Sequence, residues 1–148
     1  MSSAPTGSTQ GWAVLIATKR TAVALERRAD ALLRARALTL TQLRLLLDVD
    51  ERHTTYPNQL AGDLLISRQA THHHLATLAA RGAVSLGSEG RPVRTVSLTP
   101  EGRHLTSRGI ADLALLLDRV AHPNLHTILP MITRLAAAAS DPLPRWDL

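Results

Sequence analysis

Apolar residues recur every three or four positions along residues 12–36, which is the spacing of one face of a helix. The resulting seam is narrow and contains several small side chains: Leu15, Thr18, Ala22, Leu25, Ala29 and Leu32. Such a seam predicts packing against another helix, which belongs either to the same chain or to a second subunit. The preceding residues 1–10 are small and polar, and we expect them to form a disordered tail.

Two shorter helices are predicted next by apolar spacing and by residues that favour helix starts. Thr39 or Thr41 can cap a helix over residues 43–47, because a threonine hydroxyl accepts a hydrogen bond from a free N–H of the first turn. Pro57 fits the first turn of a helix that runs to about residue 65, since that position needs no N–H donor. The three residues before this proline have a preference for strand.

A third short helix is expected over residues 68–81, and the pattern then changes to that of strands. Ser67 is a favourable N-cap, and Gly82 is a favourable residue to end the helix. Alternating apolar residues then occupy 84–86 and 93–98, separated by glycines and a proline. This pattern predicts a β-hairpin with a basic tip.

The last third of the chain reads as two further helices and a tail. Thr99 and Pro100 form a helix start, and the helix continues to about residue 121, where a His-Pro-Asn sequence breaks it. A last helix is expected over residues 125–139. The proline-rich residues 140–148 are expected to be a C-terminal tail.

Composition limits the class of protein. The chain has 148 residues, of which 45% are hydrophobic, enough for one folded domain with an aliphatic core. The absence of cysteine excludes disulfides and thiolate metal sites. No apolar run approaches the ~20 residues that span a bilayer, and the N-terminus does not resemble a signal peptide. We therefore expect a cytoplasmic protein without a membrane partner.

Positive charge is concentrated in two segments of this chain, whose formal net charge is +5. Residues 1–40 carry six Lys and Arg against two acidic residues. Residues 67–103 carry five arginines against two acidic residues, together with three consecutive histidines. A basic patch of this size suits nucleic acid better than it suits a membrane surface.

Three helices followed by a basic hairpin form the order of a winged helix-turn-helix, in which one helix enters the major groove of DNA. The stretches "LTLTQLRLLLDVD", "QLAGDLLISRQATHHHLATLAARGAVSL" and "VSLTPEGRHL" resemble the MarR family of bacterial transcriptional regulators, and the resemblance covers residues 12–139. It implies a mainly α fold with a small β-hairpin wing. In a single domain 11–139, the winged helix-turn-helix at 39–99 would lie between dimerisation helices at 11–38 and 100–139.

The resemblance also implies a homodimer that binds a pseudo-palindromic operator in double-stranded DNA. It implies repression that is relieved by a small ligand, often aromatic or anionic, bound between the dimerisation helices and the DNA-binding module. Trp12, Lys19 and His53 are the polar or aromatic residues best placed to line such a ligand site. No motif in the sequence indicates a cofactor.

The tip of the expected wing departs from the family pattern, which usually contains Asp-x-Arg or Asp-Arg-Arg. Gly90 stands where the aspartate is usual, and Pro92 stands where an arginine is usual. The ion pair that stiffens the family's wing therefore lacks its usual residues. Arg91 remains the best cation at the tip, Arg94 can substitute for the lost one, and Pro92 can stiffen the tip by a different route.

DNA contact is expected from one side of the helix over residues 68–81 and from the wing. Arginine and glutamine pair with guanine and adenine edges, and histidine can donate to guanine or to phosphate. The expected DNA-contacting residues are Ser67, Arg68, Gln69, His72, His73, Arg91 and Arg94.

We do not expect a metal site at the three consecutive histidines, His72, His73 and His74. Successive residues on a helix are turned by about 100°, so the three rings point in three directions. His74 falls at the edge of the core beside Leu78, and we expect it to be a structural, hydrogen-bonded histidine.

Two other classes of function stay open at this point. One is a winged-helix module that binds proteins and has no operator. The other is a metal sensor that uses His53, His122 and His126. Because the chain has no glycine-rich phosphate loop, no G-x-S-x-G and no H-E-x-x-H motif, we do not expect an enzyme.

Overall fold

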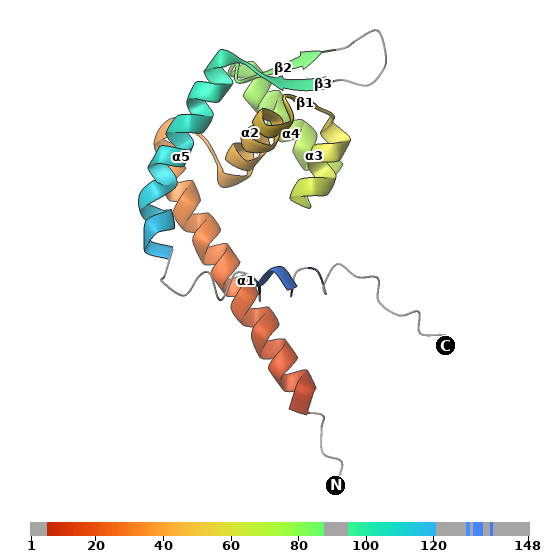
Figure 1. Ribbon diagram of the computed structural model, residues 1–148, viewed down its shortest axis with the longest axis vertical. Helices are drawn as coiled ribbons and strands as arrows, with labels where there is room; N and C mark the ends of the chain where they lie inside the picture. The colour runs from red at the N-terminus through yellow and green to blue at the C-terminus, as the bar shows by residue number, and fades with distance from the viewer. Residues whose placement is uncertain (1–5, 88–94, 121–129, 131, 135–136, 138–148) are drawn as a thin grey trace, which may run out of the picture. The chain divides into compact units, whose positions relative to one another are not determined.

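The computed structural model describes residues 6–87, 95–120, 130, 132–134 and 137. The chain divides into two compact units, residues 1–113 and 114–148, and the division falls inside the last long helix. The described elements are α1 (Thr6–Leu33), η1 (Arg34–Arg36), α2 (Leu40–Arg52), β1 (Thr54–Thr55), α3 (Pro57–Leu64), α4 (Arg68–Ala80), β2 (Val84–Gly87), β3 (Thr95–Leu98) and α5 (Pro100–Val120) (Figure 1). The fold is therefore mainly α with a small sheet, as expected.

The helices α2, α3 and α5 start at residues that the sequence marks as helix starts. Thr39 caps α2 and forms a reciprocal capping box with Gln42. Pro57 occupies the first turn of α3. Thr99 precedes α5, and its hydroxyl accepts a hydrogen bond from the Gly102 N–H at 3.0 Å. These signals were sufficient because they are local: the two threonine caps act on residues three positions away, and the proline needs no N–H donor in the first turn.

The wing is part of a three-stranded antiparallel sheet with the strand order β1-β3-β2. Val84 pairs with Leu98 and Leu86 pairs with Val96, which confirms the predicted hairpin. The short strand β1 adds a third strand beside β3, with Thr55 opposite Val96. The tip, residues 88–94, lies outside the described residues, and Arg91 and Arg94 lie there with it.

The core of the first unit is built almost entirely from aliphatic side chains. Its fully buried members come mainly from α2, α3, α4 and β3: Leu43, Leu45, Leu46, Val49, Leu60, Leu75, Leu78 and Val96. Gly102 lets the start of α5 lie directly on the residue before β2, because a Cβ on Gly102 would fall 1.9 Å from the Ala83 carbonyl oxygen. The sheet and the first turn of α5 are therefore fixed against each other.

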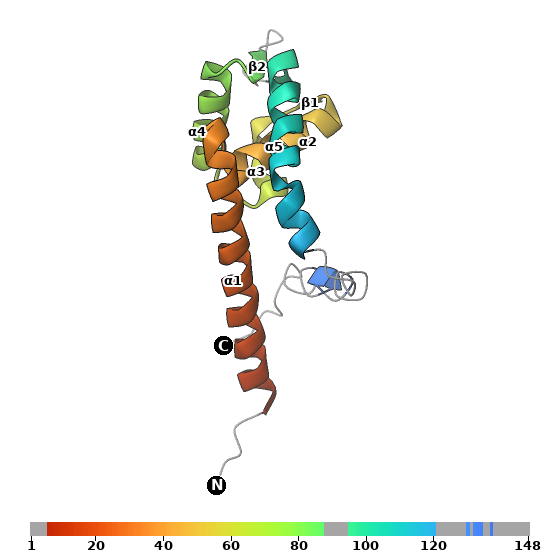
Figure 2. The ribbon, with the colours of Figure 1, turned by 90° about the vertical axis from the view of Figure 1, so that its left-hand side faces the viewer.

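Helix α1 begins earlier than the sequence pattern predicts. Residues 6–10, expected to belong to a disordered tail, are its first turns. The prediction was wrong for these residues because extending an existing helix adds one hydrogen bond per residue and needs no apolar seam. Residues 9–24 are all exposed, and this half of α1 extends away from the other elements of the first unit (Figure 1 and Figure 2).

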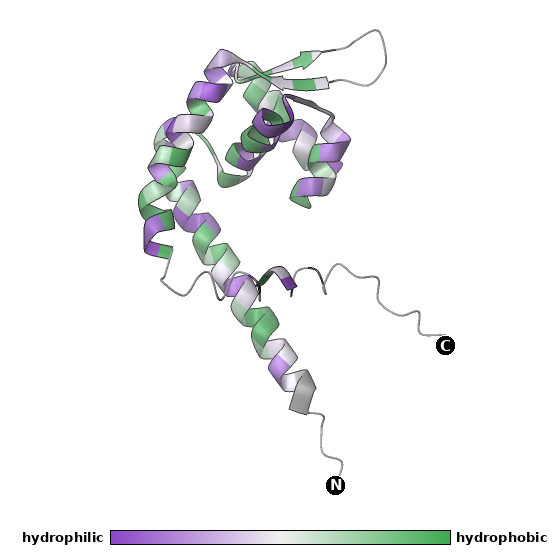
Figure 3. Ribbon diagram, viewed as in Figure 1, coloured by the Kyte–Doolittle hydropathy of each residue, from purple (hydrophilic) through white to green (hydrophobic). Residues whose placement is uncertain are grey.

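The predicted seam of α1 is buried only towards its C-terminal end. Ala29 is buried and Leu25 is half-buried, whereas Leu15 is 57% exposed. Figure 3 shows apolar positions along the extended half of the helix. Within the described residues, the first half of the seam has no covering from its own chain.

The second unit is described only in part. Leu115, Leu117 and Val120 on its portion of α5 are exposed. In the segment expected to form the last helix, the described residues 130, 132–134 and 137 are helical. His122 and His126 lie outside the described residues. None of the described helices is long and apolar enough to cross a lipid bilayer.

Candidate nucleic-acid interface

Helices α3 and α4 are joined by a three-residue turn held by backbone hydrogen bonds. Leu65 adopts a left-handed conformation with φ 54°, which ends α3. The Ile66 N–H donates to the Ala61 carbonyl at 3.1 Å. Ser67 then starts α4, and its hydroxyl accepts from the Ala70 N–H at 3.1 Å. The turn fixes the direction in which α4 leaves α3, as a helix-turn-helix requires.

Helix α4 has one buried face and one polar face, as the sequence predicts. Thr71, Leu75 and Leu78 are at most 2% exposed and attach the helix to the core. The exposed residues of α4 are Arg68, Gln69, His72, His73, Ala76 and Ala80. The small alanines leave room for close approach of another molecule along the C-terminal half of this face.

We call the four exposed polar residues of α4 the α4 polar face: Arg68, Gln69, His72 and His73. It combines a guanidinium, a carboxamide and two imidazoles, and no acidic residue lies on α4. These groups supply the planar donors and acceptors that read base edges, and the positive end of the helix dipole lies beside them. Ser67 still has a hydroxyl proton to donate after capping the helix.

His74 differs from the structural histidine that the sequence suggests. It is half-buried at the edge of the core, as predicted, but its Nδ1 is buried without a hydrogen-bond partner in the described part of the chain. Its ring meets that of His73 edge-on, with centroids 5.8 Å apart. Burial, followed by the neighbouring His73, lowers the pKa of His74. The expected hydrogen bond was therefore wrong for Nδ1 in the described part of the chain.

The residues proposed for ligand binding lie on two elements. Trp12 and Lys19 are exposed on α1. His53 is exposed at the end of α2, where φ 62° and ψ −43° place it in a rarely populated conformation. No group of three His, Cys, Asp or Glu among the described residues is arranged to hold a metal ion.

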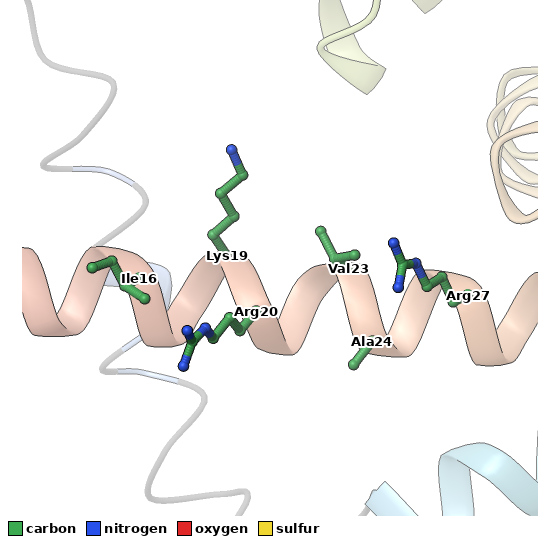
Figure 4. A pocket seen from close by; sticks show the side chains of 6 residues that line it. All are labelled: Ile16, Lys19, Arg20, Val23, Ala24 and Arg27. Carbon is green, nitrogen blue, oxygen red and sulfur yellow. The ribbon is translucent and has the colours of Figure 1, made fainter.

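One pocket of about 420 Å³ lies along α1. The described residues that line it are Ile16, Lys19, Arg20, Val23, Ala24 and Arg27 (Figure 4). Three cations therefore border a small apolar surface. Lys19 belongs to this pocket, whereas Trp12 and His53 are not among its described lining residues.

Comparison with known proteins identifies the fold through structure and not through sequence. No family model matches the chain, and no curated protein matches it by sequence. Among solved structures, Sco5413, a MarR family transcriptional regulator from Streptomyces coelicolor, has a TM-score of 0.77 at 18% identity, covering 90% of this chain and 99% of that one.

Two further structures contain a bound molecule. The transcriptional repressor CouR, bound to a 23-mer DNA duplex, has a TM-score of 0.73 at 23% identity and covers 91% of this chain and 99% of its own. NadR in complex with 4-hydroxyphenylacetate has a TM-score of 0.72 at 21% identity, and the alignment covers 87% of this chain and 94% of NadR. The alignments cover nearly the whole of each chain, so the similarity includes the helices on both sides of the winged module.

Proposed function

We propose that this chain, whose winged helix-turn-helix fold is that of MarR family transcriptional regulators, binds specific sites in double-stranded DNA and regulates transcription. The observation that carries the proposal is the α4 polar face. It lies on the second helix of a helix-turn-helix, on the side away from the core. That is the helix which enters the major groove in this class of DNA-binding module.

The residues of the α4 polar face have separate roles in this proposal. Arg68 and Gln69, in the first turn of α4, contact base edges, since guanidinium and carboxamide groups form bidentate pairs with guanine and adenine. His72 and His73 contact bases or phosphates, and Ser67 donates to a phosphate. Arg91 and Arg94, which lie outside the described residues, remain predicted contacts of the wing with the DNA backbone or the minor groove.

The homodimer belongs to the same proposal. The extended half of α1 exposes apolar side chains, including Trp12, Leu15 and Ile16. A second copy that brings the same helix would cover both surfaces around a two-fold axis, and the two α4 helices would then meet two half-sites. The exposed seam supports the alternative in which α1 packs against a partner subunit.

The proposal also includes regulation by a small ligand, whose binding relieves repression. The pocket on α1 has a volume of about 420 Å³ and contains Lys19, Arg20 and Arg27, and sites for small molecules usually measure about 300–1,000 Å³. Cations beside an apolar surface suit an aromatic acid. NadR, which has the same fold, was solved with 4-hydroxyphenylacetate.

Selection of bound duplexes from a random library tests the proposal. A regulator enriches a related set of sequences, and its affinity for them falls steeply with salt. Gln69→Ala should weaken binding of the selected duplex by about 1–3 kcal/mol and relax the preference at one base pair. Gln10→Ala, which removes an exposed glutamine from α1, is the matched control. Equal binding of all sequences would contradict the proposal and favour a protein-interaction module.

A further inference from the structure

Arg81, the residue that follows α4, attaches the end of this helix to the turn between α1 and α2. We call residues 34–39 the α1–α2 turn. The Arg81 guanidinium donates to two successive carbonyls of this turn, from Nη1 to the Ala37 oxygen at 2.6 Å and from Nη2 to the Arg36 oxygen at 2.7 Å. Both contacts connect residues more than forty positions apart in the chain.

The side chain of Arg36 connects the same turn to α5. Its Nη2 donates to Asp112 Oδ1 at 2.8 Å, and its Nε donates to the other carboxylate oxygen. The pair is only about a quarter exposed, at 28% for Arg36 and 25% for Asp112. The bond lowers the pKa of the Asp112 carboxyl and raises the pKa of the Arg36 guanidinium, so both stay charged. A planar guanidinium that meets both oxygens also fixes orientation.

The α1–α2 turn itself is held firmly. Ala37 has a left-handed φ of 49°, and the Leu38 N–H donates to the Leu33 carbonyl at 3.3 Å. The Leu40 N–H donates to Asp30 Oδ1 at 2.7 Å. The capping box then starts α2. These bonds fix the turn to both of its helices, so a contact with the turn is a contact with a rigid part of the molecule.

We propose that Arg81 and the Arg36–Asp112 pair are positioning residues, which set the angle of α4 relative to α5 and thereby the placement of the α4 polar face on DNA. The inference rests on the proposed function. Helix α4 has 13 residues and is therefore about 20 Å long. A few degrees of tilt at its Arg81 end move its Arg68 end by more than the ~0.5 Å within which binding groups must be held.

Both arginines are needed in this role because of their shape. Arg81 spans two carbonyls and Arg36 spans two carboxylate oxygens. A lysine carries the same charge but has a single ammonium group on a flexible stem, so it cannot reproduce a two-point contact. Substitution by lysine therefore removes the positioning and leaves the net charge unchanged.

Paired spin labels test the positioning without DNA. The chain has no cysteine, so Ala76→Cys on α4 and Ala111→Cys on α5 take labels only at two exposed positions. With labelled chains diluted in unlabelled protein, Arg81→Lys and Asp112→Asn should each broaden or shift the distance distribution. Arg44→Lys and Asp50→Asn, at exposed residues of α2, are the matched controls. A distribution that neither variant changes would overturn the proposal.

DNA affinity supplies a second test, because lost positioning and added positive charge change the affinity in opposite directions. Asp112→Asn makes the protein more positive, so general electrostatics would tighten its binding to any DNA. If Asp112 positions α4, Asp112→Asn should instead weaken the affinity for a selected duplex at least fivefold. The affinity for a random duplex should not weaken. Arg81→Lys should have the same effect, and the double variant should lose less than the sum of the two single losses.

Three outcomes of these measurements are distinct. A loss for the selected duplex alone supports the proposal. An equal loss for selected and random duplexes shows that the variants damage the fold, and overturns it. A library that yields no preferred sequence contradicts the proposed function, and the label distances then decide by themselves whether Arg81 and Asp112 hold α4 in place.

Discussion

Leu65 occupies a backbone conformation that disfavours its own side chain. It has φ 54° and ψ 40°, and its side chain is 90% exposed. A left-handed conformation costs an ordinary residue about 1–2 kcal/mol because Cβ approaches the following carbonyl oxygen. The turn between α3 and α4 requires this conformation, so any residue with a Cβ at position 65 has the same conformational cost.

Leu65→Gly should therefore stabilise the protein. Glycine removes the Cβ contact but loses about 0.5–1 kcal/mol more backbone freedom on folding, which leaves a net gain of roughly 0.5–1 kcal/mol. Thermal unfolding followed by circular dichroism measures the gain as a midpoint higher by about 1–4 °C. Leu65→Ala keeps Cβ and is the control. An equal gain from alanine would show that side-chain exposure, and not backbone conformation, is the cause.

At the scale of the element, the two ends of α1 differ in their exposure. Lys19, Arg20 and Arg27 line the pocket on its exposed half, whereas Ala29 and Leu33 at its C-terminal end are buried in the core. A helix that is fixed at one end and exposed at the other can bind a ligand without disturbing the core. The pocket is therefore a suitable place to test the proposed regulation.

Titration with 4-hydroxyphenylacetate, followed by calorimetry, tests the pocket on α1. Lys19→Gln should weaken binding about tenfold, which corresponds to ~1.4 kcal/mol, because a charge-assisted contact with the carboxylate is lost. Arg44→Gln removes an exposed cation from α2, outside this pocket, and should leave the affinity unchanged. The neutral 4-hydroxyphenylacetamide should bind more weakly. Similar affinities for acid and amide would contradict an anion site.

At the scale of the whole molecule, the exposed apolar side chains of α1 support the proposed homodimer. Leu15 is 57% exposed, Ile16 is 48% exposed, and Trp12 is 65% exposed. Several large apolar side chains on one exposed stretch of helix are typical of an interaction surface. In a two-fold symmetric dimer each of these residues would be buried twice, once in each subunit.

Sedimentation at micromolar concentration should give a mass of twice the 16.0 kDa of one chain. Leu15→Glu should raise the dimer dissociation constant at least tenfold, because two apolar contacts are lost and two charges are buried. Leu47→Glu, at a leucine of α2 that is 38% exposed, is the control and should not change the mass. A wild-type chain that sediments as a monomer would contradict the proposed homodimer.

The sequence by itself determined most of the local elements and the polar side of α4, but it placed the start of α1 too late and left Thr39 and Thr41 as alternative caps of α2. The caps at Thr39, Ser67 and Thr99 act over three residues, and the helical period assigns Thr71, Leu75 and Leu78 to the buried side. A composition rich in leucine and poor in aromatics likewise required an aliphatic core. These features depend on neighbours in the chain, so the order of residues was sufficient to predict them.

Only the tertiary structure decided the contacts between distant parts of the chain. Arg36 and Asp112 are 76 positions apart, and no spacing or motif pairs them. The two carbonyls that accept hydrogen bonds from Arg81, and the lack of a partner for His74 Nδ1 among the described residues, likewise depend on how helices pack. Periodicity shows which side of a helix is buried but not which residue of another helix faces it. The α4 polar face was therefore predictable, whereas the residues proposed to position it were not.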